Sequence, residues 1–341
     1  MNSIKVITER YLEQLRKRKP GMLLDEKYIY GDDADEDDIV ENPPKLVNLD
    51  LHKMDFSGLT LSGIDFSNSN LSDCKFNDAT VEECIFDGAN LENVVFDNTV
   101  ISENRFIGTN MKNCDFSLIE QLWKNKFGGA NLYGTKFDGI NIGKNWFNFA
   151  NLEKASFKNC VLNISDFYGF KYNNMRESDF TNAKMYGVNI IGCDCSNSKF
   201  IEANLDNVTI QETNFVRSDM RHMCIVNTNI DECMFSYTNM AGSVFKKSTF
   251  TSIPLANYLV STIMRDTTWC DCVIKKAYFD NTTLDNSSFK NCKLECITFK
   301  ECNMHGMSID AESTVDRVRS YNTDMSKSEI HATGELSCET W

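Results

Sequence analysis

The strongest regularity in the chain is an apolar residue at every fifth position. From Phe56 to Phe116 the fifth positions hold only Phe, Leu, Val, Ile and Met, and the residue two places before most of them is small. The remaining positions are mostly Asn, Asp, Ser, Gly, Glu and Lys. A fixed repeat determines the fold more strongly than local propensities do, so the fold prediction starts from this period.

The five-residue register is interrupted and resumes along the chain. We expect register slips near residues 117–126, 168–174 and 253–258. The second run extends from Phe127 to Phe167, the third begins at Met175, and the last ends at Ile309. The four runs together contain 49 central apolar residues.

A period of five fits neither an α-helix nor a single β-strand. On a helix, successive fifth positions lie about 140° apart and form no apolar stripe. On a strand, an odd spacing alternates between the two faces. A chain that turns a corner every five residues does fit, because each short side then points its central residue and the small residue before it inward.

Individual units carry a recognisable motif. Ala89-Asn90-Leu91, Ala130-Asn131-Leu132 and Ala203-Asn204-Leu205 resemble the A-(D/N)-L-x-x unit of pentapeptide-repeat proteins, and the resemblance extends over residues 54–311. It implies an all-β solenoid, a right-handed quadrilateral β-helix with about 20 residues in each coil and about twelve coils in total. Stacked coils of this kind need caps at both ends, because their end strands would otherwise be unpaired.

We therefore expect three segments. Residues 1–45 do not follow the period: residues 3–19 have the pattern of an amphipathic helix, and an acidic run follows at residues 32–38. This segment is either a helical cap with an acidic linker or a partner-binding or secretion segment. Residues 46–311 form the β-helix, and residues 312–341 form a C-terminal cap or tail.

Charge and composition restrict the function classes. The net charge of −14 argues against binding to nucleic acid or anionic membranes. No apolar stretch reaches the roughly 18 residues of a membrane span. The 14 cysteines without a signal-peptide pattern favour a reducing compartment and hence a cytoplasmic protein. The acidity is local: residues 46–116 carry −8 from twelve acidic and four basic side chains, whereas residues 117–172 carry +3 from seven basic and four acidic ones.

We expect no catalytic, cofactor or metal site. Nine cysteines occupy the small inward position, where apolar packing explains them. The pairs Cys193/Cys195 and Cys270/Cys272 lack the second pair of ligands that a zinc site needs. Outward carboxylates on a rod without a cleft do not suit acid–base catalysis. No phosphate-binding loop or metalloprotease motif occurs.

Two sets of outward residues are candidates for binding a partner. The first is aromatic and lies in the basic middle of the chain: Trp123, Trp146, Phe149 and Tyr168. The second is acidic: Glu82, Glu83, Asp87 and Glu92. Exposed aromatic rings beside lysines are typical of binding hot spots. The alternative for the aromatic set is that residues 117–126 fold over the rings and bury them.

The expected function is that of a non-catalytic protein-interaction module. Family members resemble B-form DNA in width and negative charge and bind DNA gyrase or topoisomerase IV, so the resemblance implies a DNA mimic that binds a DNA-binding enzyme. The basic middle argues against mimicry along the whole rod. One alternative is a bacterial effector or scaffold, secreted without a signal peptide, that docks a host protein. A structural spacer, with a homodimer through a capping end, is the other. The expected partner is a protein, with no direct contact to nucleic acid or membrane.

Overall fold

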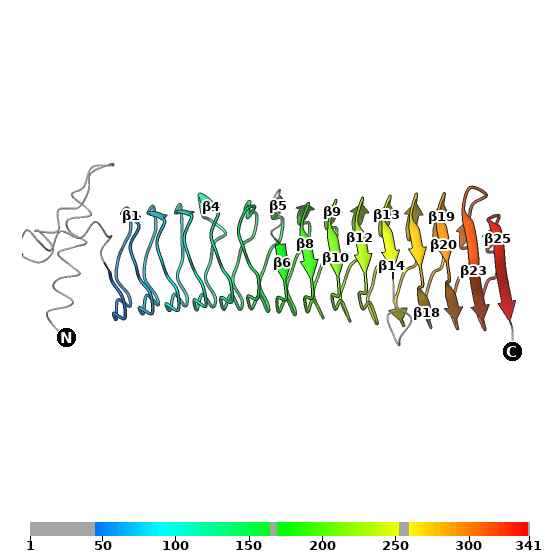
Figure 1. The fold of residues 1–341 in the computed structure, drawn as a ribbon, viewed down its shortest axis with the longest axis horizontal. Coiled ribbons are helices and arrows are strands. Elements are labelled where there is room, and N and C mark those ends of the chain that lie inside the picture. The colour runs from blue at the N-terminus through cyan, green and yellow to red at the C-terminus, as the bar shows by residue number, and fades with distance from the viewer. Residues whose placement is uncertain (1–44, 164–168, 252–258, 340–341) are drawn as a thin grey trace, which may run out of the picture.

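The computed structural model describes residues 45–163, 169–251 and 259–339. These residues form an all-β solenoid of about 13 turns, which extends as one rod with the N-terminal turns at one end and the C-terminal turns at the other (Figure 1). The predicted fold class is thus confirmed, with about one turn more than expected. The helix predicted for residues 3–19 lies outside the described residues.

The strands are short and pair in parallel from turn to turn, in three sheets along the rod. The first sheet contains β1 (Thr60–Ser62), β2 (Thr80–Glu82), β3 (Val100–Ser102) and β4 (Gln121–Trp123). The second contains β6 (Gly169–Lys171), β8 (Asn189–Ile191), β10 (Thr209–Gln211), β12 (Asn229–Asp231), β14 (Thr249–Thr251), β15 (Leu259–Val260), β17 (Val273–Lys275), β18 (Tyr278–Asp280), β20 (Lys293–Glu295), β21 (Thr298–Lys300), β23 (Thr314–Tyr321) and β25 (Thr333–Glu339). The third contains β5 (Val161–Asn163), β7 (Lys184–Tyr186), β9 (Asn204–Asp206), β11 (Cys224–Val226), β13 (Val244–Lys246), β16 (Thr268–Cys270), β19 (Ser288–Lys290), β22 (Ser308–Ile309) and β24 (Glu329–Ile330).

The central residues of the repeat form the core. All of those predicted are buried except Phe167, which lies outside the described residues. Residues one turn apart stack directly: the ring of Phe86 lies 5.0 Å from that of Phe66 and 4.9 Å from that of Phe106, nearly parallel to both. The 20-residue turn therefore converts a five-residue period into continuous columns of aromatic and aliphatic side chains.

The corners explain the polar composition. The residue two places after most central residues has a left-handed backbone, with φ of 57° at Asn68 and 61° at Asn93. Asn, Asp and Gly adopt this conformation more readily than other residues do. A sequence that turns every five residues must therefore be rich in them.

The first register slip is smaller than predicted. Leu122 in β4 is a central residue, buried to 2% exposure and aligned with Ile101 of β3. The turn contains one extra residue, and no separate loop forms between residues 117 and 126. The pattern failed to show Leu122 because it follows Phe116 by six residues instead of five.

The second slip begins before the predicted position. The prediction placed Phe167 above Phe147, but Phe170 of β6 is the buried residue that stacks there, with ring centroids 5.7 Å apart. The extra residues therefore precede Phe170 and do not follow Phe167. The segment 252–258, near the third slip, lies outside the described residues.

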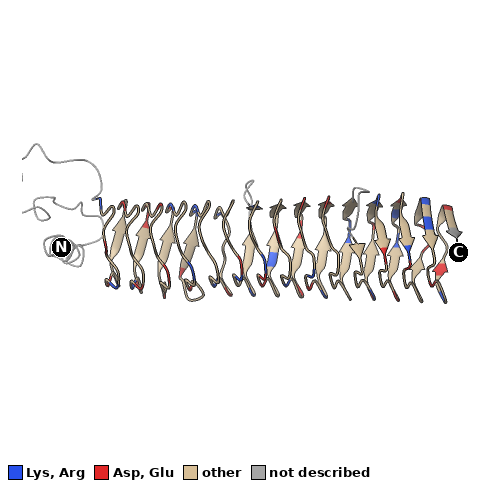
Figure 2. Ribbon diagram, turned by 90° about the horizontal axis from the view of Figure 1, so that it is seen from below, with Lys and Arg blue, Asp and Glu red and all other residues tan. Residues whose placement is uncertain are grey.

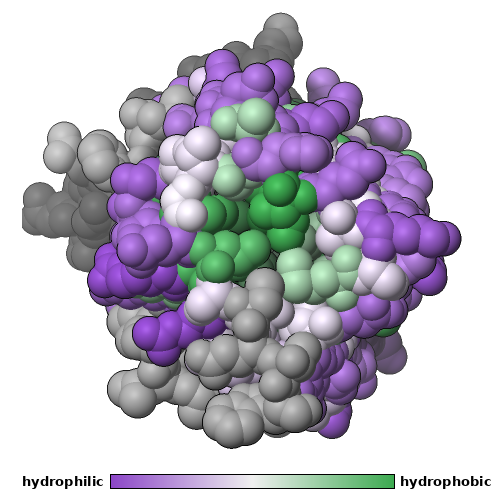
Figure 3. Space-filling view, turned by 90° about the vertical axis from the view of Figure 1, so that its right-hand side faces the viewer, coloured by the Kyte–Doolittle hydropathy of each residue, from purple (hydrophilic) through white to green (hydrophobic). Residues whose placement is uncertain are grey.

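The stacking continues beyond residue 311. The long strand β23 pairs with β20 and β21, and β25 pairs in turn with β23. Figure 3 views this end of the rod and shows an apolar centre within a hydrophilic rim. Ile330 and Leu336 pack against the core there and are only partly buried. The described ranges contain no helix that is long and apolar enough to span a membrane.

Candidate partner-binding surfaces

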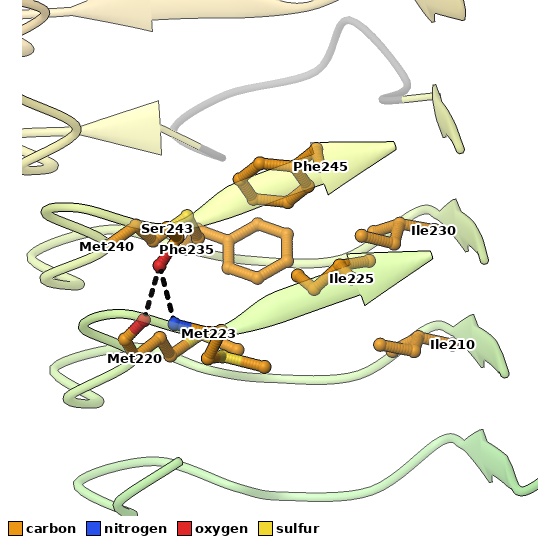
Figure 4. A pocket seen from close by; sticks show the side chains of 9 residues that line it. All are labelled: Ile210, Met220, Met223, Ile225, Ile230, Phe235, Met240, Ser243 and Phe245. Atoms are coloured by element: carbon orange, nitrogen blue, oxygen red, sulfur yellow. Dashed lines mark hydrogen bonds between the residues drawn. The ribbon is translucent and has the colours of Figure 1, made fainter. Parts of the chain in front are cut away.

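Buried side chains fill the described interior of the rod. A cavity of about 10 Å³ lies between neighbouring turns, where methionines and isoleucines replace stacked phenylalanines (Figure 4). This is about the size of one water-sized probe. Its polar side chain, Ser243, already donates to the carbonyl of Met220 at 2.8 Å and accepts from the amide of Met223 at 3.1 Å. Any recognition must therefore take place on the outside.

The cysteines belong to this closed interior. The nine at the inward position are all buried. Burial raises the pKa of Cys84 and Cys160 to about 12, so both thiols stay protonated at neutral pH. Among the described residues no group of three or more His, Cys, Asp and Glu side chains is arranged to hold a metal ion. The side chain of Cys338 lies outside the described residues.

The acidic candidates lie on a single turn but on different sides of it. Glu82 belongs to β2, Glu83 forms the next corner, and Asp87 and Glu92 lie in the turns at the two corners that follow. Asp87 pairs with Arg105 at 2.6 Å and Glu92 with Lys112 at 3.6 Å. The two unneutralised carboxylates are thus Glu82, which accepts a hydrogen bond from Ser102 at 3.2 Å, and the exposed Glu83.

The sequence did not reveal these pairings because the partners are 18 and 20 residues apart. On a solenoid with 20 residues per turn, this spacing places them side by side on neighbouring turns. Figure 2 shows basic and acidic residues interspersed along the rod. An excess of acid remains over residues 46–116 after pairing: twelve carboxylates and four cations belong to this segment, and only Glu103 and Asp115 also pair with lysines of the following turns, Lys124 and Lys136.

The aromatic candidates lie on one side of the rod and its two corners. The side is the one whose central residues are Phe127, Phe147 and Phe170. We call the following outward residues the aromatic face: Trp123, Lys126, Lys144, Trp146, Phe149, Lys171 and Tyr172. Since no loop forms at residues 117–126, that segment does not cover the rings; Trp123 itself is an outward residue of β4.

Lysines lie against both tryptophans. The ammonium of Lys144 is 4.7 Å from the ring centre of Trp123, and that of Lys126 is 5.7 Å from the ring centre of Trp146. Both tryptophans are half-buried. These distances are those of cation–π interactions, which hold the lysines along the face.

The most exposed part of the aromatic face is a pair of stacked rings. Phe149 is 66% exposed and Tyr172 is 55% exposed, and their rings lie 5.6 Å apart at 15°. Tyr168, the predicted member, lies outside the described residues. The prediction missed Tyr172 because it took Phe167 as the central residue of this side, whereas the central residue is Phe170, three positions later. With Phe170 recognised as the central residue, Tyr172 falls at the corner directly next to Phe149.

The repeat also matches a family model. The model for pentapeptide repeats, with eight copies, matches residues 189–222, which lie in the longest regular run of the rod. Here every fifth residue is buried and each turn has four sides. Residues 189–222 are therefore pentapeptide repeats.

A second family model, the SV2A/B/C luminal domain, matches residues 46–116. HetL, a pentapeptide-repeat protein involved in heterocyst differentiation regulation in the cyanobacterium Nostoc sp. strain PCC 7120, is 15% identical; the match covers 66% of this chain and 90% of HetL with a TM-score of 0.28. QnrB1, a plasmid-mediated fluoroquinolone resistance protein, is 12% identical over 67% of this chain and 92% of its own, with a TM-score of 0.26. No curated protein sequence matches the chain.

Proposed function

We propose that this chain is a non-catalytic protein-binding rod whose acidic first turns, residues 46–116, bind the basic surface of a partner protein as a DNA mimic does. The observation that carries the proposal is the combination of a closed interior with a charged, regular exterior. The cavity of about 10 Å³ admits no substrate. The net charge of −8 over residues 46–116 supplies a long-range attraction for a basic partner.

The partner class follows from the charge and from the family. A protein surface that binds DNA is basic and complements a rod with regularly spaced carboxylates. DNA gyrase and topoisomerase IV are such partners for pentapeptide-repeat proteins, so bacterial gyrase is the first candidate to test. The proposal is confined to the acidic turns because residues 117–172 carry +3. A cytoplasmic location is part of the same proposal.

The test is a binding and supercoiling assay with matched charge reversals. The variant Glu82→Lys/Glu83→Lys removes the two unneutralised carboxylates. Its control, Glu202→Lys/Glu212→Lys, makes the same charge change at two exposed corners in the middle of the rod. We expect the first variant to bind gyrase several-fold more weakly and the control to bind normally. Binding of the unmodified protein should weaken steeply with salt.

Two results would contradict the proposal. One is binding that does not change with ionic strength, because screened surface charges require such a change. The other is an equal loss of binding in both charge-reversed variants, which would reflect total charge and not the acidic turns.

The alternative function, an effector or scaffold that docks a host protein, is favoured by a different observation. The exposed rings of Phe149 and Tyr172 lie outside the acidic turns. Aromatic residues on a surface are common anchors in protein interfaces. Capture of one specific protein from a eukaryotic lysate, lost in Phe149→Asn and unaffected by Glu82→Lys/Glu83→Lys, would favour this alternative over gyrase binding.

A further inference from the structure

Two large rings occupy corner positions that suit them poorly. Phe149 and Tyr172 have φ angles of 61° and 53°, in the left-handed region that Gly and Asn adopt most readily. Both are exposed, so neither ring contributes to the core. The left-handed conformation is common to most corners of the rod, and these two corners differ from the others in that their rings are exposed and stack on each other.

The corners of the two turns that precede Phe149 carry no side chain. The preceding corners are Gly108 and Gly129, and a side chain placed on either would meet no atom within contact distance. On the other side, Phe149 stacks on Tyr172, whose ring lies directly against Gly192. One face of the ring pair is therefore open above two glycines, where a second aromatic side chain can stack.

Unneutralised cations lie along the same face. Lys126 is exposed, and Lys144 and Lys171 are half-buried. In the described part of the chain none of the three forms an ion pair, whereas the neighbouring Lys124 and Lys136 pair with Glu103 and Asp115. The face thus combines an open aromatic stack with three ammonium groups that form no ion pair among the described residues, two of which lie against tryptophan rings. A segment that carries both tyrosines and carboxylates complements it.

The chain itself contains such a segment. Tyr28 and Tyr30 are followed by the acidic run of residues 32–38, and residues 23–45 together carry −7. The described chain begins at Lys45, on the same side of the rod as the aromatic face. Residues one turn apart connect the two in an unbroken series of bridges: Lys45, Asp65, Ile85, Arg105, Lys126 and Trp146.

The distances allow contact. Five turns at about 4.8 Å separate Lys45 from Trp146, roughly 24 Å. The seven residues from Asp38 to Lys45 span about 23–25 Å when extended, and the tyrosines reach further.

We propose that residues 28–38 dock on the aromatic face of their own chain. The carboxylates of residues 32–38 pair with Lys126, Lys144 and Lys171, and a tyrosine stacks on the open side of Phe149. The docked segment covers the basic middle of the rod, and a protein that binds the aromatic face must first displace it. This contact is independent of whether the acidic turns bind gyrase.

Zero-length carbodiimide crosslinking of the full chain, followed by mass spectrometry, tests the contact because it joins only amines and carboxylates that touch. We expect crosslinks from residues 32–38 to Lys126, Lys144 or Lys171. The control lysines are Lys246 and Lys247, which are exposed and form no ion pair among the described residues. They lie about ten turns from Lys45, roughly 48 Å, beyond the reach of the acidic run.

Phe149→Asn separates docking from folding. Asn suits the left-handed corner, so the variant should keep the melting temperature of the parent while the crosslink yield to the three lysines falls several-fold. The docking proposal is overturned if residues 32–38 react no more with the three lysines than with Lys246 and Lys247. It is also overturned if a mixture of isotope-labelled and unlabelled chains gives mainly mixed crosslinks, which would place a second copy on the face.

Discussion

A central phenylalanine is the residue type whose truncation should destabilise the rod most. Phe96 is buried and stacks on Phe116 at 4.7 Å and on Phe76 at 5.6 Å. We expect Phe96→Ala to lower the free energy of unfolding by about 3–5 kcal/mol, because the removed ring leaves a cavity between two turns. Urea denaturation followed by circular dichroism measures the change.

Outward asparagines should differ in a way that the five-residue pattern does not show. The sequence places Asn90 and Asn204 alike on the outside, with equal tolerance expected. In the structure Asn204 is exposed, but the amide of Asn90 donates to Asn70 at 3.2 Å and its oxygen accepts from Asn110 at 2.8 Å. These bonds belong to an amide ladder that continues through Asn131, Asn151 and Asn174.

We therefore predict that Asn90→Ala costs about 1–2 kcal/mol, since it breaks two side-chain hydrogen bonds between turns. Asn204→Ala should change stability by less than about 0.5 kcal/mol, as most exposed substitutions do. The same urea titration compares them. Equal values for the two variants would show that the ladder contributes nothing measurable to stability.

At the scale of the strand and its neighbours, a second ladder lies inside the rod. Asn104, Asn125 and Asn145 replace small residues at the inward position and are fully buried. The oxygen of Asn125 accepts from the backbone amide of Asn104 at 3.0 Å, and its amide donates to the carbonyl of Ile101 at 3.0 Å. Each member thus satisfies backbone groups of the turn before it.

Asn125→Ala should be more destabilising than its size suggests. It leaves the buried amide of Asn104 without its acceptor, which costs about 1–3 kcal/mol, and also removes the side-chain hydrogen bond to the carbonyl of Ile101. The matched control is Cys114→Ala, at the same inward position on the opposite side, where only a weak thiol bond to the carbonyl of Leu91 is lost. If the two variants lower the melting temperature equally, the hydrogen bonds of the buried asparagines add nothing measurable to the packing of their side chains.

The same elements show what the period can and cannot predict. Columns such as Phe66, Phe86 and Phe106 follow from a fixed spacing, so the fold was predictable. Leu122 and Phe170 were not, because each follows a slip of one or more residues and the pattern has no internal evidence of where an insertion lies. The correct position requires the backbone pairing, which joins residues a full turn apart.

At the scale of the whole rod, the five-residue spacing also predicted part of the candidate surfaces, and the slips hid the rest. Phe149 was placed outward from its distance to Phe147, and it is exposed. Tyr172 was missed because the slip before it was misplaced. The neutralisation of Asp87 by Arg105 was hidden because it depends on neighbours 18 residues away. That either surface binds a partner stays a prediction.

The buried thiols give the whole rod a specific sensitivity to alkaline pH. Burial raises the pKa of Cys84, Cys160 and Cys233 to about 12 and that of Cys193 and Cys302 to about 11, from an ordinary value of 9.0. Between pH 9 and pH 11 to 12, the thiols of the unfolded chain release protons that the same thiols retain in the folded chain. The unfolded state is therefore favoured progressively as the pH rises above about 9, by about 1.4 kcal/mol per pH unit for each such thiol.

We predict that the free energy of unfolding is nearly constant from pH 7 to 8 and falls steeply between pH 9 and 11. Urea denaturation in the presence of a non-thiol reductant measures the slope. The variant Cys84→Ala/Cys160→Ala/Cys193→Ala should start from lower stability but lose it less steeply, by about 4 kcal/mol per pH unit, because three of the titrating thiols are gone. If both proteins have the same slope, the exposed lysines and tyrosines cause the alkaline loss, and the thiols are not the groups that couple proton release to unfolding of the rod.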